Sequence, residues 1–315
     1  MKKNQNLGRS IRITVGLAAL LFFALVGCSR SPQEVATSTA AFTATPVPAF
    51  TMTPLPQATD TPVVLTPTSL PTEIINPHGG VMRLIPDGPF MMGSSDGMAD
   101  EEPAHIVNLP AFYMDKYEVT NALYKFCVDA GACQAPANTS AGIHSGAYGT
   151  YGSPQFDNYP VIWVDWDRAQ SYCAWRGTRL PSEPEWEKAA RGTDGRKYPW
   201  GDAIDPTFAN YGSNVPDDYD GVFGKTTAVG SYPKGQSPYG IYDMAGNVWE
   251  WVADWYDVYP GGDPGANSAF GQEAYRVLRG GSWSDDPALL RTSFRGGNVP
   301  NTTVNYIGFR CASTP

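Results

Sequence analysis

Residues 276–297 read RVLRGGSWSDDPALLRTSFRGG and place hydroxyl, indole, carboxylate and guanidinium groups close together in a glycine-rich stretch. Binding and catalytic residues are often carried by loops of this kind. The stretch contains no Cys and no His, so it lacks an obvious nucleophile and base. It is therefore either a catalytic centre of unusual chemistry or a framework that has lost its reactive groups.

The first 27 residues have the pattern of an export signal. Four basic residues precede an apolar run of 12 residues, which has the length of a signal h-region and is too short to span a bilayer. The sequence Leu25-Val26-Gly27-Cys28 resembles a bacterial lipobox, which implies cleavage before Cys28 and lipidation of its sulfur. An ordinary signal peptide followed by an unrelated Cys is the alternative. We expect an extracytoplasmic lipoprotein anchored to a membrane through Cys28.

Residues 28–78 have a composition unlike the rest of the chain. Eleven Thr and nine Pro fall between 29 and 77, and proline both restricts the backbone and removes hydrogen-bond donors. This segment is predicted to be a disordered tether, which extended would span up to roughly 150 Å at about 3.1 Å per residue. The folded domain is then expected at 79–315.

The charge of the chain excludes one class of partner. Loss of the four positive charges of the signal would change the formal net charge from −9 to −13. A surface this acidic repels nucleic acid and anionic lipid. We therefore expect no nucleic-acid partner, and contact with the membrane only through the lipid.

Helices are expected where capping residues flank apolar positions at helical spacing. Thr120 and Gly131 bound the first, whose apolar face holds Leu123, Phe126 and Cys127. Two more are expected at 165–177 and 182–192, the last with a Ser182–Glu185 capping box. Two short strands are expected within 79–94 about a turn at Pro86-Asp87-Gly88, and further strands at 107–120 with a kink at Pro110, 250–256, 275–280 and 306–311. Residues 193–245 should be largely irregular, which gives an α+β class.

Several long motifs resemble the formylglycine-generating enzyme family, also called the sulfatase-modifying factor family. They are GPFMMGS at 88–94, EVTNALYKFC at 118–127, YPVIWVDWDRAQSYCAWRGTRLPSEPEWEKAARG at 159–192, YPWGD at 198–202, GIYDMAGNVWEWVADWY at 240–256, RVLRGGSW at 276–283 and NYIGFRCA at 305–312. The resemblance covers 79–313 in order. It implies a fold related to C-type lectins, poor in regular secondary structure and usually calcium-bound.

The stretch DMAGNVWE at 243–250 is a candidate calcium site. Calcium takes six to eight oxygen ligands from carboxylates and carbonyls, and Gly246 permits a sharp bend. The resemblance implies the side chains of Asp243 and Glu250 with the carbonyls of Gly246 and Val248 as ligands. From the residues alone, Asp243 could instead cap a turn while Glu250 pairs with an Arg.

A second calcium site is implied by the resemblance at Asn210, the Tyr211 carbonyl, Asp220 and the Val222 carbonyl. This stretch is one residue longer than usual, so Asp218 could replace Asp220. A solvated acidic turn is the alternative.

Cysteine use agrees with export. Four cysteines follow Cys28, and an even number outside the cytosol suggests two disulfides. The resemblance implies that Cys173 pairs with Cys311, which leaves Cys127 and Cys133 as the second pair.

The oxidases of this family bind copper(I) through two cysteines that follow GGSW. Those positions are Asp285 and Leu290 here, and neither side chain offers the soft thiolate that copper(I) requires. The catalytic residues of that reaction are therefore absent and no copper is expected. Arg279, Arg291 and Arg295 are then expected to pair with buried acids and carbonyls.

A ligand pocket is expected in the same region, where an aromatic face could stack on a ligand and polar groups could orient it. The relationship to C-type lectins implies an unknown protein or glycan as the ligand. Its predicted lining is Ser282, Trp283, Ser284, Asp285, Asp286 and Asn298. A plain exposed loop is the alternative.

Two functions remain from the sequence. The first is a calcium-stabilised module that binds a ligand or acts as a scaffold. The second is a divergent oxidase acting on protein cysteine, or a non-haem iron enzyme of the same superfamily. The sulfoxide synthases of the superfamily carry iron-binding histidines on a helical bundle, and the Thr/Pro-rich tether leaves no place for one. The missing thiols favour the first function.

Overall fold

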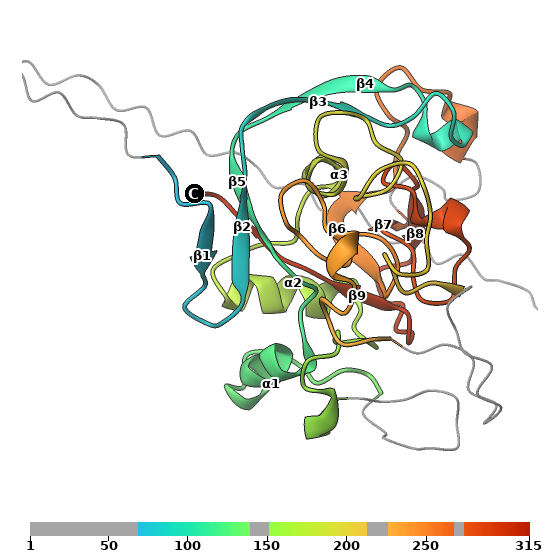
Figure 1. The fold of residues 1–315 in the computed structure, drawn as a ribbon. Helices are drawn as coiled ribbons and strands as arrows, with labels where there is room; N and C mark the ends of the chain where they lie inside the picture. The colour runs from blue at the N-terminus through green and yellow to red at the C-terminus, as the bar shows by residue number, and fades with distance from the viewer. Residues whose placement is uncertain (1–68, 139–150, 213–225, 268–273) are drawn as a thin grey trace, which may run out of the picture. The chain divides into compact units, whose positions relative to one another are not determined.

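The computed structural model describes residues 69–138, 151–212, 226–267 and 274–315. Three short helices and ten strands lie among these residues, separated by long irregular segments (Figure 1). The helices are α1 (Asn121–Asp129), α2 (Trp166–Trp175) and α3 (Glu183–Arg191). None of the described helices has the length and apolar character needed to cross a bilayer. The predicted α+β class is confirmed.

The strands form two four-stranded sheets and a two-stranded ribbon. The first sheet has the order β1-β2-β5-β10, the ribbon pairs β3 with β4, and the second sheet has the order β8-β7-β6-β9. Their bounds are β1 (Glu73–Ile75), β2 (Val81–Ile85), β3 (Gly88–Met92), β4 (His105–Leu109), β5 (Phe112–Asp115), β6 (Trp249–Trp255), β7 (Arg276–Arg279), β8 (Gly296–Asn298), β9 (Ile307–Phe309) and β10 (Ala312–Ser313).

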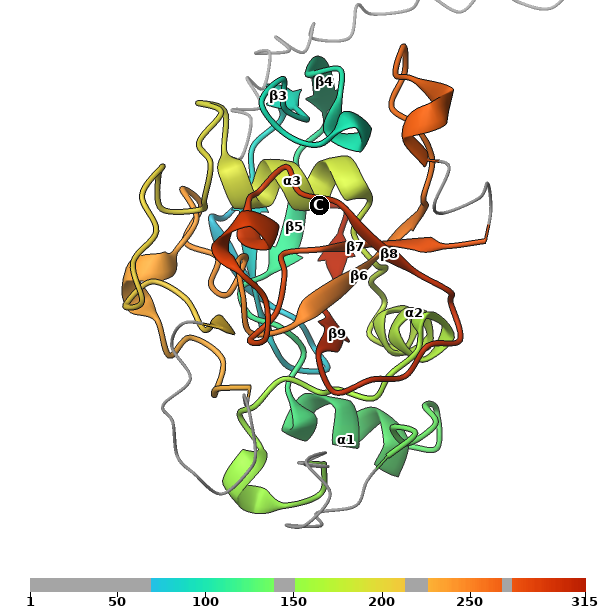
Figure 2. The same ribbon diagram turned by 90° about the vertical axis from the view of Figure 1, so that its right-hand side faces the viewer.

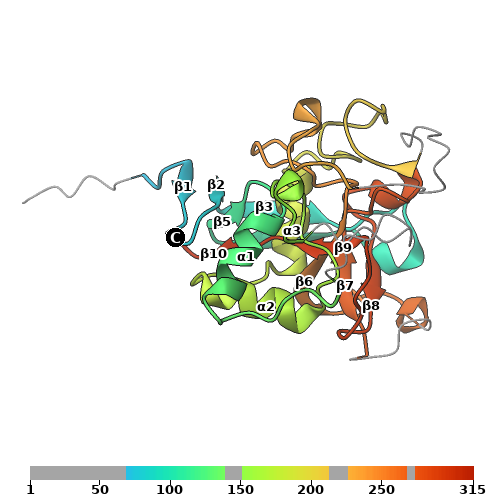
Figure 3. The same ribbon diagram turned by 90° about the horizontal axis from the view of Figure 1, so that it is seen from below.

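In the second sheet, β6 lies between an antiparallel and a parallel neighbour. It pairs antiparallel with β7 and parallel with β9, where Trp249 lies opposite Ile307. Helix α3 packs against β6 and β7, and α2 packs against β6 (Figure 2). Seen from below, α1 and α2 are neighbours (Figure 3). Residues far apart in the chain therefore meet around this sheet.

The three helices begin at the predicted caps. Thr120 Oγ1 accepts the Leu123 N–H at 3.3 Å, and Asp165 Oδ1 accepts the Arg168 N–H at 2.9 Å. Ser182 and Glu185 form the reciprocal capping box predicted for α3. These contacts satisfy backbone donors that have no partner inside the helix.

Three expectations are corrected by the packing. The strand expected at 107–120 is split near Pro110, and its two parts, β4 and β5, belong to different sheets. Phe126 was expected on the buried face of α1, but it is 63% exposed, and the fully buried Tyr124 takes that role. Residues of the expected tether join the fold, because β1 pairs with β2 over Glu73–Ile75. The domain thus begins before residue 79.

Two disulfides close the structure as expected. Cys173 on α2 is bonded to Cys311, with their Cα atoms 5.6 Å apart, and Cys127 is bonded to Cys133 across the end of α1. The first bond joins a helix to the segment between β9 and β10, so the end of the chain is tied to the core.

Candidate functional site

The glycine-rich stretch of the sequence follows β7 and turns sharply at its start. Gly280 and Gly281 have φ values of 96° and 72°, which side-chain-bearing residues rarely adopt. A Cβ on Gly281 would lie 3.0 Å from Leu290 Cδ1. The turn therefore requires glycine and brings the following residues back against Leu290.

Asp285 and Leu290, which the family resemblance aligns with the oxidase cysteines, have structural roles in this fold. Asp285 Oδ2 accepts hydrogen bonds from the Ser282 N–H at 2.8 Å and the Ser282 hydroxyl at 2.6 Å. Leu290 is fully buried in an apolar cluster with Tyr198 and Tyr211. One position closes a local turn and the other fills the core.

An open cavity of about 470 Å³ lies beside this turn, and we call it the β8 cavity. It is lined by Trp249, Leu278, Ser284, Asp285, Phe294, Arg295, Gly296, Gly297, Asn298 and Tyr306. Three of the expected pocket residues, Ser284, Asp285 and Asn298, are among them. This volume is in the range of small-molecule sites.

The other expected pocket residues lie elsewhere. Ser282 is fully buried beneath Asp285, and the Trp283 indole N–H donates to the Asn305 carbonyl at 3.4 Å. Asp286 is exposed. None of these three side chains lines the β8 cavity.

Aromatic residues of the cavity were not predicted from the sequence. Trp249, Phe294 and Tyr306 come from β6, from the segment before β8 and from the segment before β9. The Trp249 N–H donates to the Tyr306 carbonyl at 2.9 Å, and the rings of Trp249 and Phe294 lie 6.0 Å apart. Their positions within the GNVWEW and NYIGFRCA motifs were the signal that could have identified two of them.

Arg295 lines the cavity but is neutralised by its partners. Its Nε and one terminal nitrogen donate to the two oxygens of Glu183 at 2.7 and 2.8 Å. The other terminal nitrogen donates to the carbonyls of Asp100 and Asp257. Burial opposes its charge, but Glu183 raises the pKa of Arg295 overall.

Arg279 and Arg291, which were also expected to pair with buried acids and carbonyls, have buried partners. Arg279 pairs with Glu187 and donates to three carbonyls, while Arg291 forms a two-pronged ion pair with Glu101. Charge-assisted pairs of this geometry fix side-chain orientation. These arginines therefore hold the frame of the site.

The candidate calcium segment joins three buried carboxylates around one arginine. Glu250 accepts two hydrogen bonds from Arg310, each at 2.7 Å, and one from the Trp186 indole at 2.8 Å. Asp243 has a φ of 58° and accepts the Gly230 N–H at 2.7 Å. Glu250 thus pairs with an arginine, as in the alternative to calcium, whereas Asp243 accepts an N–H from a segment 13 residues earlier in the chain.

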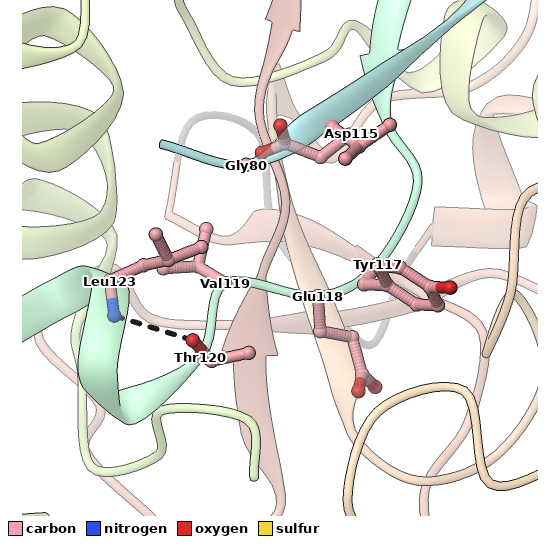
Figure 4. A pocket seen from close by; sticks show the side chains of 8 residues that line it. Gly80, Asp115, Tyr117, Glu118, Val119, Thr120 and Leu123 are labelled. Atoms are coloured by element: carbon pink, nitrogen blue, oxygen red, sulfur yellow. Dashed lines mark hydrogen bonds between the residues drawn. The ribbon is translucent and has the colours of Figure 1, made fainter. Parts of the chain in front are cut away.

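Glu118 is the third acid, and sequence reasoning missed it. Its carboxylate accepts hydrogen bonds from the Asn247 side chain at 2.6 Å and the Val248 N–H at 3.3 Å. Figure 4 shows it directed away from Asp115, beside a small cavity of about 40 Å³. Its place in the EVTN motif, two residues before the cap of α1 at Thr120, was the available signal.

The electrostatics of this cluster favour a cation. Burial, followed by the charges of Asp243 and Glu250, raises the pKa of Glu118 well above its usual value. Burial likewise raises the pKa of Asp243 to about 6. If all three acids were ionised, the single arginine would leave an excess of negative charge, which bound protons or a bound cation would relieve.

The donor set does not settle a calcium site by itself. Among the described residues no three His, Cys, Asp or Glu side chains are grouped as metal ligands. A calcium ion here would thus depend on the carbonyls of Gly246 and Val248, and it would share Glu250 with Arg310.

The second candidate calcium site is described only in part. The Asn210 amide donates to the Asn247 side-chain oxygen at 3.2 Å, and Tyr211 is buried beside it. Asp218, Asp220 and Val222 lie outside the described residues. Asn247, which also contacts Glu118, links the two candidate sites.

Comparison with known proteins identifies the family. The model of the sulfatase-modifying factor enzyme 1-like domain matches residues 71–315. The chain belongs to this family. The solved structure of PvdO from Pseudomonas aeruginosa matches with a TM-score of 0.61 and 28% identity, over 78% of this chain and 98% of that one.

Curated relatives share the same region. Serine/threonine-protein kinase Pkn1 of Chlamydia trachomatis is 40% identical over 73% of this chain and 38% of the relative. Inactive C-alpha-formylglycine-generating enzyme 2 of Bos taurus is 31% identical over 74% of this chain and 87% of the relative. The chain spans about two fifths of the length of the first curated relatives it matches.

Proposed function

We propose that this protein is a membrane-anchored extracytoplasmic lipoprotein whose sulfatase-modifying-factor-type domain binds a ligand and does not oxidise cysteine. The observation that carries the proposal is the use of the two copper-ligand positions. The Asp285 carboxylate accepts a hydrogen bond from the Ser282 hydroxyl. Leu290 is fully buried in an apolar cluster. An activating copper(I) ion would need thiolates at both positions.

No other pair of thiols in the domain can take their place. Each of the four cysteines beyond Cys28 is in a disulfide, and disulfide sulfur lacks the thiolate charge that binds copper(I). The similarity to a relative named as an inactive formylglycine-generating enzyme supports the same conclusion. The domain keeps the fold of the family and is proposed to use it for a function other than cysteine oxidation.

The β8 cavity is the best candidate for the ligand site. It combines three aromatic side chains with Ser284, Asp285 and Asn298, and its position is held by the buried pairs of Arg295 and Arg279. Apolar walls with a few fixed polar groups are typical of ligand sites. A glycan or a side chain of a protein could be held there.

Calcium and the lipid anchor complete the proposal. The excess negative charge of Glu118, Asp243 and Glu250 supports a bound cation near Asp243–Glu250. The lipobox at residues 25–28 supports anchoring through Cys28, which lies outside the described residues. Replacement of Cys28 by Ser should release the protein from membranes and abolish its labelling with radioactive palmitate.

The absence of oxidase activity is tested directly. The purified protein is incubated with copper(I), oxygen and a cysteine-containing sulfatase-motif peptide, and the peptide mass is followed. We expect no conversion of the cysteine to an aldehyde, whereas an active formylglycine-generating enzyme in a parallel reaction should convert it. Conversion at a comparable rate would show that the protein is an oxidase.

The positive part of the proposal needs a binding assay. A glycan array and a pull-down with cell-surface proteins should identify a ligand that is lost when Tyr306 in the β8 cavity is replaced by Ala. Replacement of the exposed Ile106 on β4, remote in sequence from every cavity residue, is the matched control and should leave binding intact. Retention of binding by both variants would place the ligand elsewhere.

A further inference from the structure

We propose that the β8 cavity selects an organic cation, specifically an alkylated ammonium group, and this inference rests on the proposed ligand-binding function. The juxtaposition that suggests it is an aromatic-lined cavity with one carboxylate whose charge is not balanced. Aromatic ring faces carry negative potential and attract cations. A carboxylate at the same place adds to that attraction.

The aromatic wall is assembled by the second sheet. The parallel pairing of β6 with β9 places Trp249 beside Tyr306, and Phe294 reaches the same cavity from the segment before β8. Arg291 lies 5.6 Å from the Phe294 ring, so one face of Phe294 already carries a cation. Tyr306, which is half-buried, is then the main ring surface for a ligand, and Trp249, which is 8% exposed, adds a small part of its ring.

The charge balance of the cavity distinguishes a cation from other ligands. Arg295 and Asp285 are the oppositely charged side chains of its lining. Glu183 neutralises Arg295, and carbonyls occupy the remaining guanidinium nitrogen. Asp285 contacts only neutral donors of Ser282, and no described cation pairs with it. Asp285 is therefore the charged side chain of the lining that has no ionic partner among the described residues, which favours a cationic ligand at its end of the cavity.

The nature of the walls favours an alkylated cation over a simple one. A primary ammonium ion is strongly hydrated and would lose water hydrogen bonds against aromatic walls, whereas methyl groups on nitrogen weaken its hydration. A cavity of about 470 Å³ has room for such a group with its attached chain. The formal net charge of −9 would also steer cations toward the protein.

The experiment compares two probes of equal shape. Choline and its uncharged isostere 3,3-dimethylbutan-1-ol are titrated into the purified protein while calorimetry and tryptophan fluorescence are followed. We expect choline to bind about tenfold more tightly, because a cation–π and carboxylate contribution of about 1.4 kcal/mol separates the two. Equal affinity of the two probes, or no binding of choline, would overturn the proposal.

Matched variants locate the site. Asp285→Asn keeps an acceptor for Ser282 but removes the charge, and it should bring the affinity for choline close to that for the isostere. Asp286→Asn removes the same charge one residue away, at an exposed position, and should change little. A larger loss of choline affinity in Asp285→Asn than in Asp286→Asn would support the proposal, and equal losses in the two variants would contradict it. Thermal unfolding of both variants shows whether the fold is retained.

Further experiments distinguish a protein-borne cation from a free one, and failure of this inference from failure of the proposed function. A peptide carrying trimethyl-lysine that binds more tightly than choline would indicate a protein ligand, and the reverse order would indicate a free small molecule. Binding of a neutral glycan in the β8 cavity, unaffected by Asp285→Asn, would disprove the cation while leaving the ligand-binding function intact. Copper-dependent peptide oxidation would instead disprove the function itself.

Discussion

Asp254 gives the sharpest test of the electrostatics, because its charge is opposed by its surroundings. It lies on β6 and accepts the Glu183 N–H at 2.7 Å, beside the first turn of α3. Burial, followed by the charge of Glu183, raises its pKa to about 6 from an ordinary value of 3.8. We expect Asp254→Asn, which keeps an acceptor for that N–H, to stabilise the protein at neutral pH.

The size of the stabilisation follows from the difference between the pKa of Asp254 in the folded protein and its pKa in the unfolded chain. Between pH 3.8 and about 6 the folded protein holds a proton on Asp254 that the unfolded chain releases, so the contribution of this group to stability falls as the pH rises. A shift of about two units corresponds to about 3 kcal/mol. The stabilisation by Asp254→Asn should therefore be greatest above pH 7, at up to about 3 kcal/mol, and should vanish near pH 4.

The assay is urea unfolding of both proteins at several pH values from 4 to 8. Acids remote from Asp254 titrate equally in the two proteins, so the difference between their free energies of unfolding reports Asp254 together with its coupling to Glu183 and Glu185. Asp194→Asn is the control, since a hydrogen bond from Arg196 lowers the pKa of that acid and its loss should have the opposite sign. A difference that does not vary with pH, or destabilisation above pH 7, would refute the reasoning.

Three further predictions concern the bonds and packing around the site. Replacing both cysteines of Cys173–Cys311 by Ala should lower the free energy of unfolding by about 5 kcal/mol, because the disulfide closes a loop of 138 residues. The same change at Cys127–Cys133, whose loop has 6 residues, should lower it by about 2 kcal/mol. Denaturant unfolding of the two double-Ala variants measures both values. A larger cost for the shorter loop would show that strain or packing dominates. Chelation with EGTA should lower the melting temperature and added calcium should restore it, and an unchanged transition would disprove a structural calcium ion. Leu290→Ala should lower the free energy of unfolding by about 2–5 kcal/mol, and a loss below 1 kcal/mol would mean that this position tolerates a reactive group.

The parts of the fold that were predictable are those set by neighbours in the chain. The caps of α1, α2 and α3 depend on a side chain and a backbone N–H three residues away, so the spacing is visible in the sequence. The disulfide pairing followed from the resemblance to a family. The prediction that Phe126 is buried was wrong. Helical periodicity places Phe126 on the same side of the helix as Cys127, but it does not show whether a neighbouring element covers that position.

The candidate site was predicted in part for the same reason. Ser284 and Asp285 were found because they belong to the stretch that first suggested chemistry, and Asn298 directly follows it. Glu118 was missed because its meeting with Asp243 and Glu250 joins residues more than 120 positions apart. Such convergence has no local signal in a single sequence.

The sequence by itself determined that copper chemistry of the family kind lacks its ligands, because side-chain chemistry at Asp285 and Leu290 does not depend on the fold. Only the tertiary structure decided what replaced it. The pairing of β6 with β7 and β9 brings Trp249 to Tyr306, while the partners of Arg295 cancel its charge and leave that of Asp285 unmatched. Contacts of this kind depend on strand register and burial, which the folded chain alone establishes.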